Sequence, residues 1–206
     1  MKIKVCGLTV SENIQAVDLL GADYLGFIYY SKSKRFSSIL KEDIEACRAK
    51  KVGVFVNSPL SDVLEQINKS ALDVIQLHGE ESVQYCKELR KYNQEVELIK
   101  AIPIQDKRSL KQVEPYLDIA NYLLFDTACL SRGGSGVKFD WTILDEYKGT
   151  LPFFLSGGLG VEDVMCLKKW KHPFLYGVDV NSRFEIKPGV KDINVLNTFI
   201  KKLRYE

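Results

Sequence analysis

Apolar runs of strand length alternate with amphipathic segments along the whole chain, and this alternation predicts a regular succession of strands and helices. Eight runs have the length of a β-strand and few polar residues inside them. They predict strands over residues 2–5, 23–30, 52–57, 73–77, 95–102, 121–125, 151–156 and 174–178. Near-continuous apolar strands of this kind are typical of parallel pairing in a sheet that is buried on both faces.

Helices are predicted between the strands, and some of them carry their own boundary signals. Thr9 and Glu12 have the spacing of a capping box, and Gly21 lies where the first helix should end. Pro59 follows Ser58 and suits the first position of a later helix. The predicted helices span residues 9–20, 43–50, 60–70, 82–91, 107–113, 141–147, 161–170 and 190–202.

The number of repeats indicates how the strands are arranged. An open sheet of eight strands would leave two edges to protect, whereas a closed barrel leaves none. Eight strand–helix repeats in 206 residues therefore predict an α/β fold, a single-domain (β/α)8 TIM barrel over residues 1–206. This length is near the lower limit for that fold.

Composition narrows the class of protein without naming a reaction. The formal net charge of +2 argues neither for a nucleic-acid binder nor for a polybasic membrane surface, and we expect no nucleic acid or membrane as a partner. The N-terminal apolar run is too short for a signal peptide, and no stretch approaches the roughly 18 apolar residues of a membrane span. Five cysteines, an odd number without a C-x-x-C pair, suit reduced thiols, so we expect a cytoplasmic protein.

In a barrel of this kind, functional groups gather on the loops that follow the strands. Gly157 and Gly158 separate the seventh strand from a helix, and paired glycines there let a phosphate approach backbone N–H groups. The eighth strand is followed by a second turn of the same kind. The candidate residues at the strand ends are Cys6, Arg35, Asn57, His78, Asp126, Gly157, Gly158 and the segment 179–182.

This set of residues argues against two kinds of chemistry. It lacks the clustered carboxylates and histidines that a catalytic metal needs, so no metal site is predicted. A Schiff-base mechanism needs a lysine at a strand end, and the only candidate, Lys100, still has two residues of its strand after it.

Nine ordered motifs carry a resemblance to one enzyme family. They are KVCGLT (4–9), GFIYYSKSKR (26–35), VGVFVN (52–57), IQLHG (75–79), FDT (125–127), GGSG (133–136), LSGG (155–158), GVDV (177–180) and KPGVKD (187–192). In this order and spacing they resemble phosphoribosylanthranilate isomerase of tryptophan biosynthesis. No single motif is decisive, but the ordered set covers the whole chain and is specific.

The resemblance implies a reaction and a catalytic pair. The family carries out an Amadori rearrangement of N-(5-phosphoribosyl)anthranilate to 1-(2-carboxyphenylamino)-1-deoxyribulose 5-phosphate. By resemblance, Cys6 is the general base and Asp126 the general acid. A free cysteine has a pKa of about 8.5. The pKa of Cys6 must therefore be shifted, or its deprotonation assisted, for it to act as a thiolate at neutral pH. The pKa of Asp126 must be raised well above about 3.9 for this residue to donate a proton.

The resemblance also implies how the substrate is held. Arg35 would hold the anthranilate carboxylate, because a guanidinium presents a fork of donors that matches it. Backbone N–H groups of the two strand-end turns would hold the phosphate. The implied substrate-binding residues are Arg35, Gly157, Gly158, Asp179, Asn181 and Ser182.

The expected partner is a small-molecule phosphosugar, bound by a monomer or a homodimer. No cofactor is expected, because the iminium form of the substrate is its own electron sink. Two residues depart from the family pattern: Lys34 stands where proline is usual, and Arg183 where glycine is common. The glycines of the loop 128–138 make that loop the expected lid.

Two alternative functions remain open. The first is a lyase or synthase that acts on a related phosphosugar, which would need a lysine acid and a glutamate at strand ends. The second is a phosphate-binding barrel that has lost catalysis. The presence of both Cys6 and Asp126 argues against this second alternative, because a site that has lost catalysis does not need to keep either residue.

Overall fold

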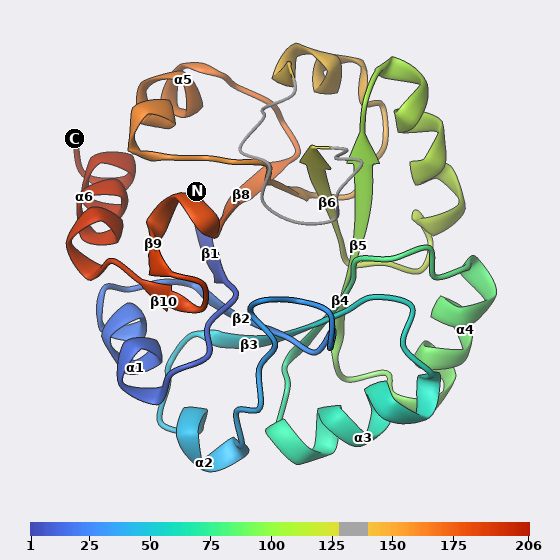
Figure 1. Ribbon diagram of the computed structural model, residues 1–206. Helices are drawn as coiled ribbons and strands as arrows, with labels where there is room; N and C mark the ends of the chain where they lie inside the picture. Colours follow the sequence, from blue (N-terminus) through green and yellow to red (C-terminus); the bar gives the residue numbers. More distant parts are fainter. Residues whose placement is uncertain (128–139) are drawn as a thin grey trace.

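The structure, a computed structural model, describes residues 1–127 and 140–206. Eight strands form a closed parallel barrel in sequence order (Figure 1). Pairing of β1 with both β2 and β8 closes the barrel. The strands span Lys2–Cys6 (β1), Tyr24–Ile28 (β2), Lys50–Phe55 (β3), Val74–Leu77 (β4), Glu97–Ile104 (β5), Tyr122–Thr127 (β6), Phe153–Leu155 (β7) and Leu175–Val180 (β8). The predicted TIM barrel is therefore confirmed.

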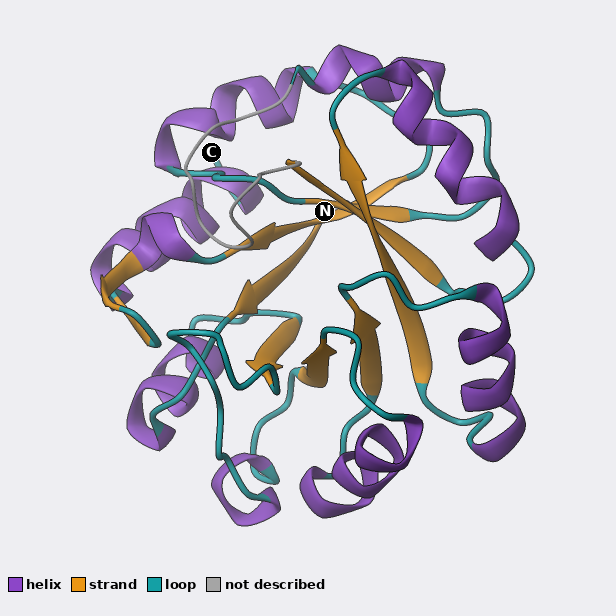
Figure 2. Cartoon of the chain, turned by 45° about the vertical axis from the view of Figure 1, so that its right-hand side comes forward, coloured by secondary structure: helices purple, strands orange, loops and turns teal. Residues whose placement is uncertain are grey.

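Helices surround the barrel on its outside, as Figure 2 shows. The α-helices span Ser11–Leu19 (α1), Lys41–Ile44 (α2), Leu60–Ser70 (α3), Val83–Tyr92 (α4), Val164–Lys169 (α5) and Ile193–Arg204 (α6). The 3₁₀-helices span Lys107–Tyr116 (η1), Trp141–Glu146 (η2), Val161–Asp163 (η3) and Ser182–Phe184 (η4). Within the described residues, none of these helices combines the length and the apolar character needed to cross a membrane.

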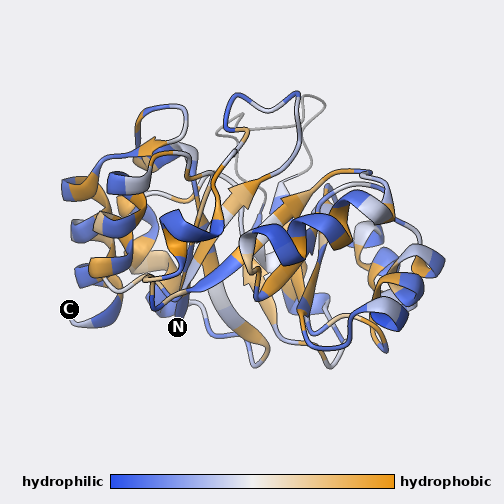
Figure 3. Cartoon of the chain, turned by 90° about the horizontal axis from the view of Figure 1, so that it is seen from below, coloured by the Kyte–Doolittle hydropathy of each residue, from blue (hydrophilic) through white to orange (hydrophobic). Residues whose placement is uncertain are grey.

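Two apolar clusters pack against the opposite faces of the strands. The larger lies between the strands and the outer helices and includes Phe125 and Phe153. The smaller fills the barrel interior and includes Val52, Val74 and Phe154. Because successive residues of a strand point to opposite faces, each strand is buried on both sides. Figure 3 shows the hydrophobic colour along the strands and a mixture of hydrophobic and hydrophilic colour on the helices.

The predicted start of the first helix is wrong. Thr9 does not cap this helix, because its Oγ1 donates to the backbone oxygen of Gly189 at 3.0 Å. Val10 occupies the N-cap position instead, without a capping side chain. The predicted end is confirmed, since Gly21 has a φ of +86° directly after the last turn.

The helix predicted over 43–50 is also wrong. The helix α2 ends at Ile44, and Lys50 already belongs to β3. Tertiary hydrogen bonds draw this segment into the sheet: Ala49 N donates to Asp18 Oδ1 at 2.9 Å, and Lys50 N donates to Asp23 O at 3.0 Å.

The helix predicted over 190–202 begins later than its apolar pattern indicates. Val190 and Lys191 form the strand β10, which pairs antiparallel with β9 (Glu185–Lys187). The helix α6 then starts at Ile193, where Asp192 caps it by accepting hydrogen bonds from two backbone N–H groups. A short hairpin thus follows the eighth strand where only a loop was expected.

The remaining predicted helices differ mainly in type and boundary. The segments predicted over 107–113 and 141–147 are 3₁₀-helices, and 161–170 divides into η3 and α5. The helix over residues 60–70 is confirmed, although Pro59 is its N-cap rather than its first residue.

Truncation of a large side chain in the barrel interior tests this packing. Phe154 is fully buried among aromatic rings, with that of Tyr24 at 5.3 Å. We expect Phe154→Ala to lower the free energy of unfolding by about 3–5 kcal/mol in urea titrations, because it leaves a cavity. Leu19→Ala, at a side chain that is 83% exposed, is the control and should change it by no more than about 0.5 kcal/mol. Equal effects of both substitutions would contradict the packing.

Candidate active site

The carboxyl ends of the strands bring the predicted residues to one rim of the barrel. Cys6 ends β1, Asp126 lies near the end of β6, and Asp179 lies near the end of β8. Arg35 comes from the loop after β2, and the glycine pair from the turn after β7. All of these strands are parallel, so their ends meet at the same edge.

Cys6 is buried among charged groups. Its residue is 5% exposed, and a Cβ on Gly26 of the neighbouring strand would lie only 2.9 Å from its Sγ. Burial raises the pKa of the Cys6 thiol, and the ammonium groups of Lys4 and Lys191 only partly oppose this rise. The thiol is therefore the resting form at neutral pH.

Lys4 is a buried cation that the sequence-based prediction missed. It lies on the same strand face as Cys6, two residues before it, and its side chain is fully buried. Its Nζ donates to Asp179 Oδ1 at 2.8 Å, and its ammonium group acts electrostatically on the Cys6 thiol. Asp179, predicted as a substrate contact, thus points at Lys4 and is itself only 6% exposed at its side chain.

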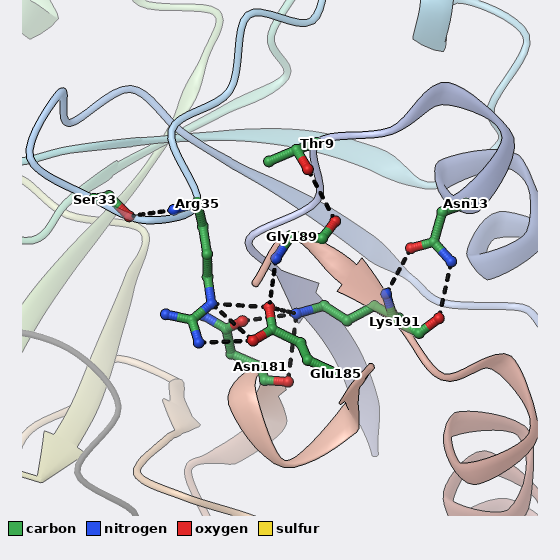
Figure 4. Close-up of polar contacts among 8 residues, drawn as sticks. All are labelled: Thr9, Asn13, Ser33, Arg35, Asn181, Glu185, Gly189 and Lys191. Atoms are coloured by element: carbon green, nitrogen blue, oxygen red, sulfur yellow. Dashed lines mark hydrogen bonds and ion pairs between the residues drawn. The ribbon is translucent and has the colours of Figure 1, made fainter. Parts of the chain in front are cut away.

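Arg35 reaches the rim beside the turn that follows β8. A Cβ on Gly7 would lie 2.7 Å from Arg35 Cδ and 2.9 Å from Asn181 Oδ1, so these two side chains converge on that glycine. The guanidinium of Arg35 also forms an ion pair with Glu185, with Nη2 and Oε2 2.7 Å apart (Figure 4). Glu185 was not predicted, because nothing local marks it as a partner of Arg35.

Asp126 has a histidine neighbour on the rim. His78 Nε2 lies 3.3 Å from Asp126 Oδ2, and Gln76 Nε2 lies 2.7 Å from His78 Nδ1. The other carboxylate oxygen of Asp126 accepts a hydrogen bond from Thr127 N at 2.9 Å. His78 was among the candidate residues at the strand ends, and the structure places it in contact with Asp126.

Within the described residues, the two predicted phosphate turns have backbone N–H groups that donate no hydrogen bond. Gly157 and Gly158 have φ values of +103° and +66°, which other residues rarely adopt. Among the hydrogen bonds of the described residues, none is donated by the backbone N–H of Gly157, Gly158, Asn181 or Ser182. Four such groups on neighbouring turns can bind an anion.

Arg183 is the second departure from the family pattern, and it forms an ion pair with η3, the helix that follows the glycine turn. Its Nη2 lies 3.7 Å from Glu162 Oε1, and both side chains are about half exposed. The guanidinium of Arg183 therefore faces Glu162 of η3.

Lys100 does not serve as a free amine. Its Nζ contacts Glu81 Oε2 at 3.0 Å and donates to Gly79 O at 2.7 Å, and both charged side chains are buried. Glu81 in turn accepts hydrogen bonds from the backbone N–H groups of Asn57 and Gly79. The Lys100–Glu81 pair thus shapes the loops after β3 and β4 and is not placed to act as a Schiff base.

The loop predicted to act as a lid lies outside the described residues. It includes Cys129 and the motif GGSG at 133–136.

The family of the chain follows from its similarity to known proteins. The family model for N-(5'-phosphoribosyl)anthranilate isomerase matches residues 3–202. The chain belongs to this isomerase family. The resemblance seen in the motifs is thereby confirmed.

Named relatives match the chain over nearly its full length. The N-(5'-phosphoribosyl)anthranilate isomerase of Parabacteroides distasonis is 43% identical over 98% of this chain and 93% of its own. That of Thermotoga neapolitana is 36% identical over 99% of this chain and 98% of its own.

Solved structures of the family share the fold. The isomerase of Thermotoga maritima has a TM-score of 0.87 and 34% identity, covering 99% of this chain and 98% of its own. Another structure, with a TM-score of 0.83, 32% identity and the same coverage, holds an isomerase of this family in complex with reduced 1-(o-carboxyphenylamino)-1-deoxyribulose 5-phosphate.

Substitution of Gly157 tests the anion-binding turn. A Cβ there would meet Thr127 Oγ1 at 2.2 Å, and the φ of +103° is strained for alanine. We expect Gly157→Ala to weaken the binding of inorganic phosphate by about tenfold or more, as measured by calorimetric titration. The change should also lower the free energy of unfolding by about 1–3 kcal/mol.

Gly21→Ala is the matched control for this substitution. It introduces alanine at a φ of +86°, next to only the flexible end of Arg204, at the opposite end of the barrel. It should lower stability similarly and leave phosphate binding unchanged. Equal loss of phosphate binding in both variants would contradict a specific role for Gly157.

Proposed function

We propose that the isomerase reaction of this family runs in this chain with Asp126 as the general acid and Cys6 as the general base. Asp126 protonates the ring oxygen of phosphoribosylanthranilate, the bond from C1 to that oxygen breaks, and an iminium forms. Cys6 then removes the proton from C2 to give an enolamine. The enolamine takes a proton at C1 and loses the C2 hydroxyl proton, which yields the aminoketose.

The observation that carries the proposal is the pattern of charge around Cys6. A thiol at the end of a barrel strand is usually a small buried hydrophobe. Here, the buried ammonium groups of Lys4 and Lys191 act on the thiol electrostatically, and both favour the thiolate over the thiol. A group that must accept a proton from carbon gains from such neighbours, because they stabilise its charged form.

His78 positions Asp126 in this proposal. The imidazole contacts one carboxylate oxygen of Asp126 and leaves the reacting proton to be carried by that carboxyl group. Gln76 restrains the ring from its other nitrogen, so the two groups keep a constant orientation.

The two anionic ends of the substrate are held apart on the rim. Arg35 binds the anthranilate carboxylate, and the backbone N–H groups of Gly157, Gly158, Asn181 and Ser182 bind the phosphate. These N–H groups donate no hydrogen bond to any described residue, which supports this assignment. Asp179 contributes through Lys4, which it holds beside the thiol.

Two finer expectations accompany this function. We expect a cytoplasmic protein, because Cys6, Cys47, Cys86 and Cys166 are all free thiols. We also expect a monomer or a homodimer that takes a small-molecule phosphosugar and no nucleic acid.

The lyase alternative has less support from the geometry. It needs a lysine acid at the rim, and Lys100 is instead buried against Glu81. A barrel that only binds phosphate would need none of the charge arrangement around Cys6.

Replacement of the catalytic pair tests the roles directly. We expect Cys6→Ser and Asp126→Asn each to slow the enzymatic loss of fluorescence of freshly made phosphoribosylanthranilate by about 10²-fold or more. Both substitutions keep the side-chain shape but remove the thiolate or the acidic proton. Cys166→Ala, at an exposed thiol in α5, should keep the wild-type rate. A wild-type rate in either catalytic variant would rule out the role of that residue.

The raised pKa of Cys6 predicts a pH-dependent ionisation that can be measured without substrate. Because the pKa is raised, the thiolate is a minor form at pH 7 and its fraction increases through and above pH 8.5. The ultraviolet absorbance of thiolate, recorded against pH as wild type minus Cys6→Ser, isolates this group. The expected midpoint lies above about 8.5. A midpoint near neutrality would show instead that Lys4 and Lys191 outweigh burial.

A further inference from the structure

The hairpin β9–β10 carries a family motif, KPGVKD at 187–192, to which the proposed function assigns no role. This hairpin lies between η4 and α6, beside the start of α1 (Figure 1). Two of its residues, Glu185 and Lys191, turn charged side chains inward toward Arg35 (Figure 4).

Glu185 occupies one edge of the Arg35 guanidinium. Arg35 Nε donates to Glu185 Oε1 at 2.8 Å, and Nη2 donates to Oε2 at 2.7 Å. Among the described residues, Nη1 of Arg35 has no hydrogen bond. A bidentate pair of this kind fixes the plane of the guanidinium. The remaining edge is therefore held in a constant direction.

Lys191 joins this pair to the phosphate turn. Its Nζ contacts Glu185 Oε1 at 2.9 Å and donates to Asn181 Oδ1 at 2.7 Å, and its side chain is fully buried. Burial works to raise the pKa of Glu185, but Arg35 and Lys191 lower it below its ordinary value. The carboxylate is thus charged at neutral pH, and the three residues together carry one positive charge.

The backbone of the hairpin is itself anchored to the start of the chain. Thr9 Oγ1 donates to Gly189 O at 3.0 Å, and Asn13 exchanges two hydrogen bonds with the backbone of Lys191, at 2.8 and 2.9 Å. These contacts explain why Thr9 is not free to cap α1. They also restrain the hairpin relative to the loop that follows Cys6.

We propose that Glu185 and Lys191 are positioning residues that preset Arg35 for the ring carboxylate of the substrate. Glu185 holds the Nε edge of the guanidinium, which leaves Nη1 to bind the incoming carboxylate. Lys191 neutralises Glu185, so that Arg35 keeps a net attraction for an anion, and it fixes Asn181 in the phosphate turn. The hairpin thereby sets the distance between the two anion sites. This inference rests on the carboxylate role of Arg35 in the proposed function.

The charge of Glu185 and its hold on the Arg35 guanidinium predict opposite effects of Glu185→Gln on anion binding. Loss of the carboxylate raises the net charge near Arg35 by one, which by itself would strengthen the binding of an anion. Loss of the fixed guanidinium plane would weaken it. Glu185→Asp keeps the charge and withdraws the carboxylate by one methylene, so it reports position alone and remains informative if Glu185→Gln folds poorly.

The experiment compares two stable ligands by calorimetric titration. Both are 1-arylamino-1-deoxypentitol 5-phosphates, and only one carries a carboxylate in the ortho position of the ring. We expect Glu185→Gln and Glu185→Asp to weaken the binding of the carboxylated ligand by about tenfold or more. The affinity for the other ligand should change by no more than about twofold. Lys191→Met should weaken the binding of both ligands, because it disturbs Arg35 and Asn181 together. Glu97→Gln, in an exposed pair with Lys50, is the control and should change neither affinity.

A double variant distinguishes positioning from a general loss of structure. In the background of Arg35→Gln, Glu185→Gln should cause no further loss for the carboxylated ligand, because the group that it positions is absent. Additive losses, equal losses for the two ligands, or tighter binding by Glu185→Gln would each overturn the positioning role. If the wild type did not distinguish the two ligands, the carboxylate role of Arg35 would fall, and this inference with it.

Discussion

Closure of the barrel between β1 and β8 is the constraint on which the rest of the structure depends. The register of this pair places Lys4 opposite Asp179 and Val5 opposite Val180. The same alignment brings Cys6 beside the turn that contains Asn181. A slip by one residue would turn Lys4 and Cys6 out of the barrel interior, because side chains alternate between the two faces. The register of closure thus also determines the surroundings of the thiol.

Buried ion pairs hold the rim of the barrel together. Lys4 pairs with Asp179, Lys100 with Glu81, and Glu185 with both Arg35 and Lys191. Removal of one partner from such a pair costs several kcal/mol, since the other charge is left buried and alone. Two of these pairs, those of Lys4 and Lys191, hold cations at constant positions near the thiol. The same interactions therefore serve both the fold and the proposed chemistry.

Local signals in the chain were reliable for some residues and misleading for others. Gly157, Cys6 and Asp126 could be assigned to the rim because each follows or ends an apolar run, and strand ends of a parallel barrel share one edge. Thr9 has the spacing of a capping residue, yet Gly189 takes its hydroxyl. Lys191 continues a helical apolar pattern, yet its backbone pairs with Asn13 and β9. In both cases a distant partner outweighed a local preference.

By itself, the sequence determined the order of eight strands, the parallel barrel, the family and the residues at the strand ends, because periodicity and turn signals are local. Only the tertiary structure decided which charges pair. The partners Lys4 and Asp179 are 175 residues apart, and Arg35 and Glu185 are 150 apart. Nothing in the neighbourhood of either residue specifies such a partner. Its identity follows from the register in which the barrel closes and from the hairpin that packs beside it.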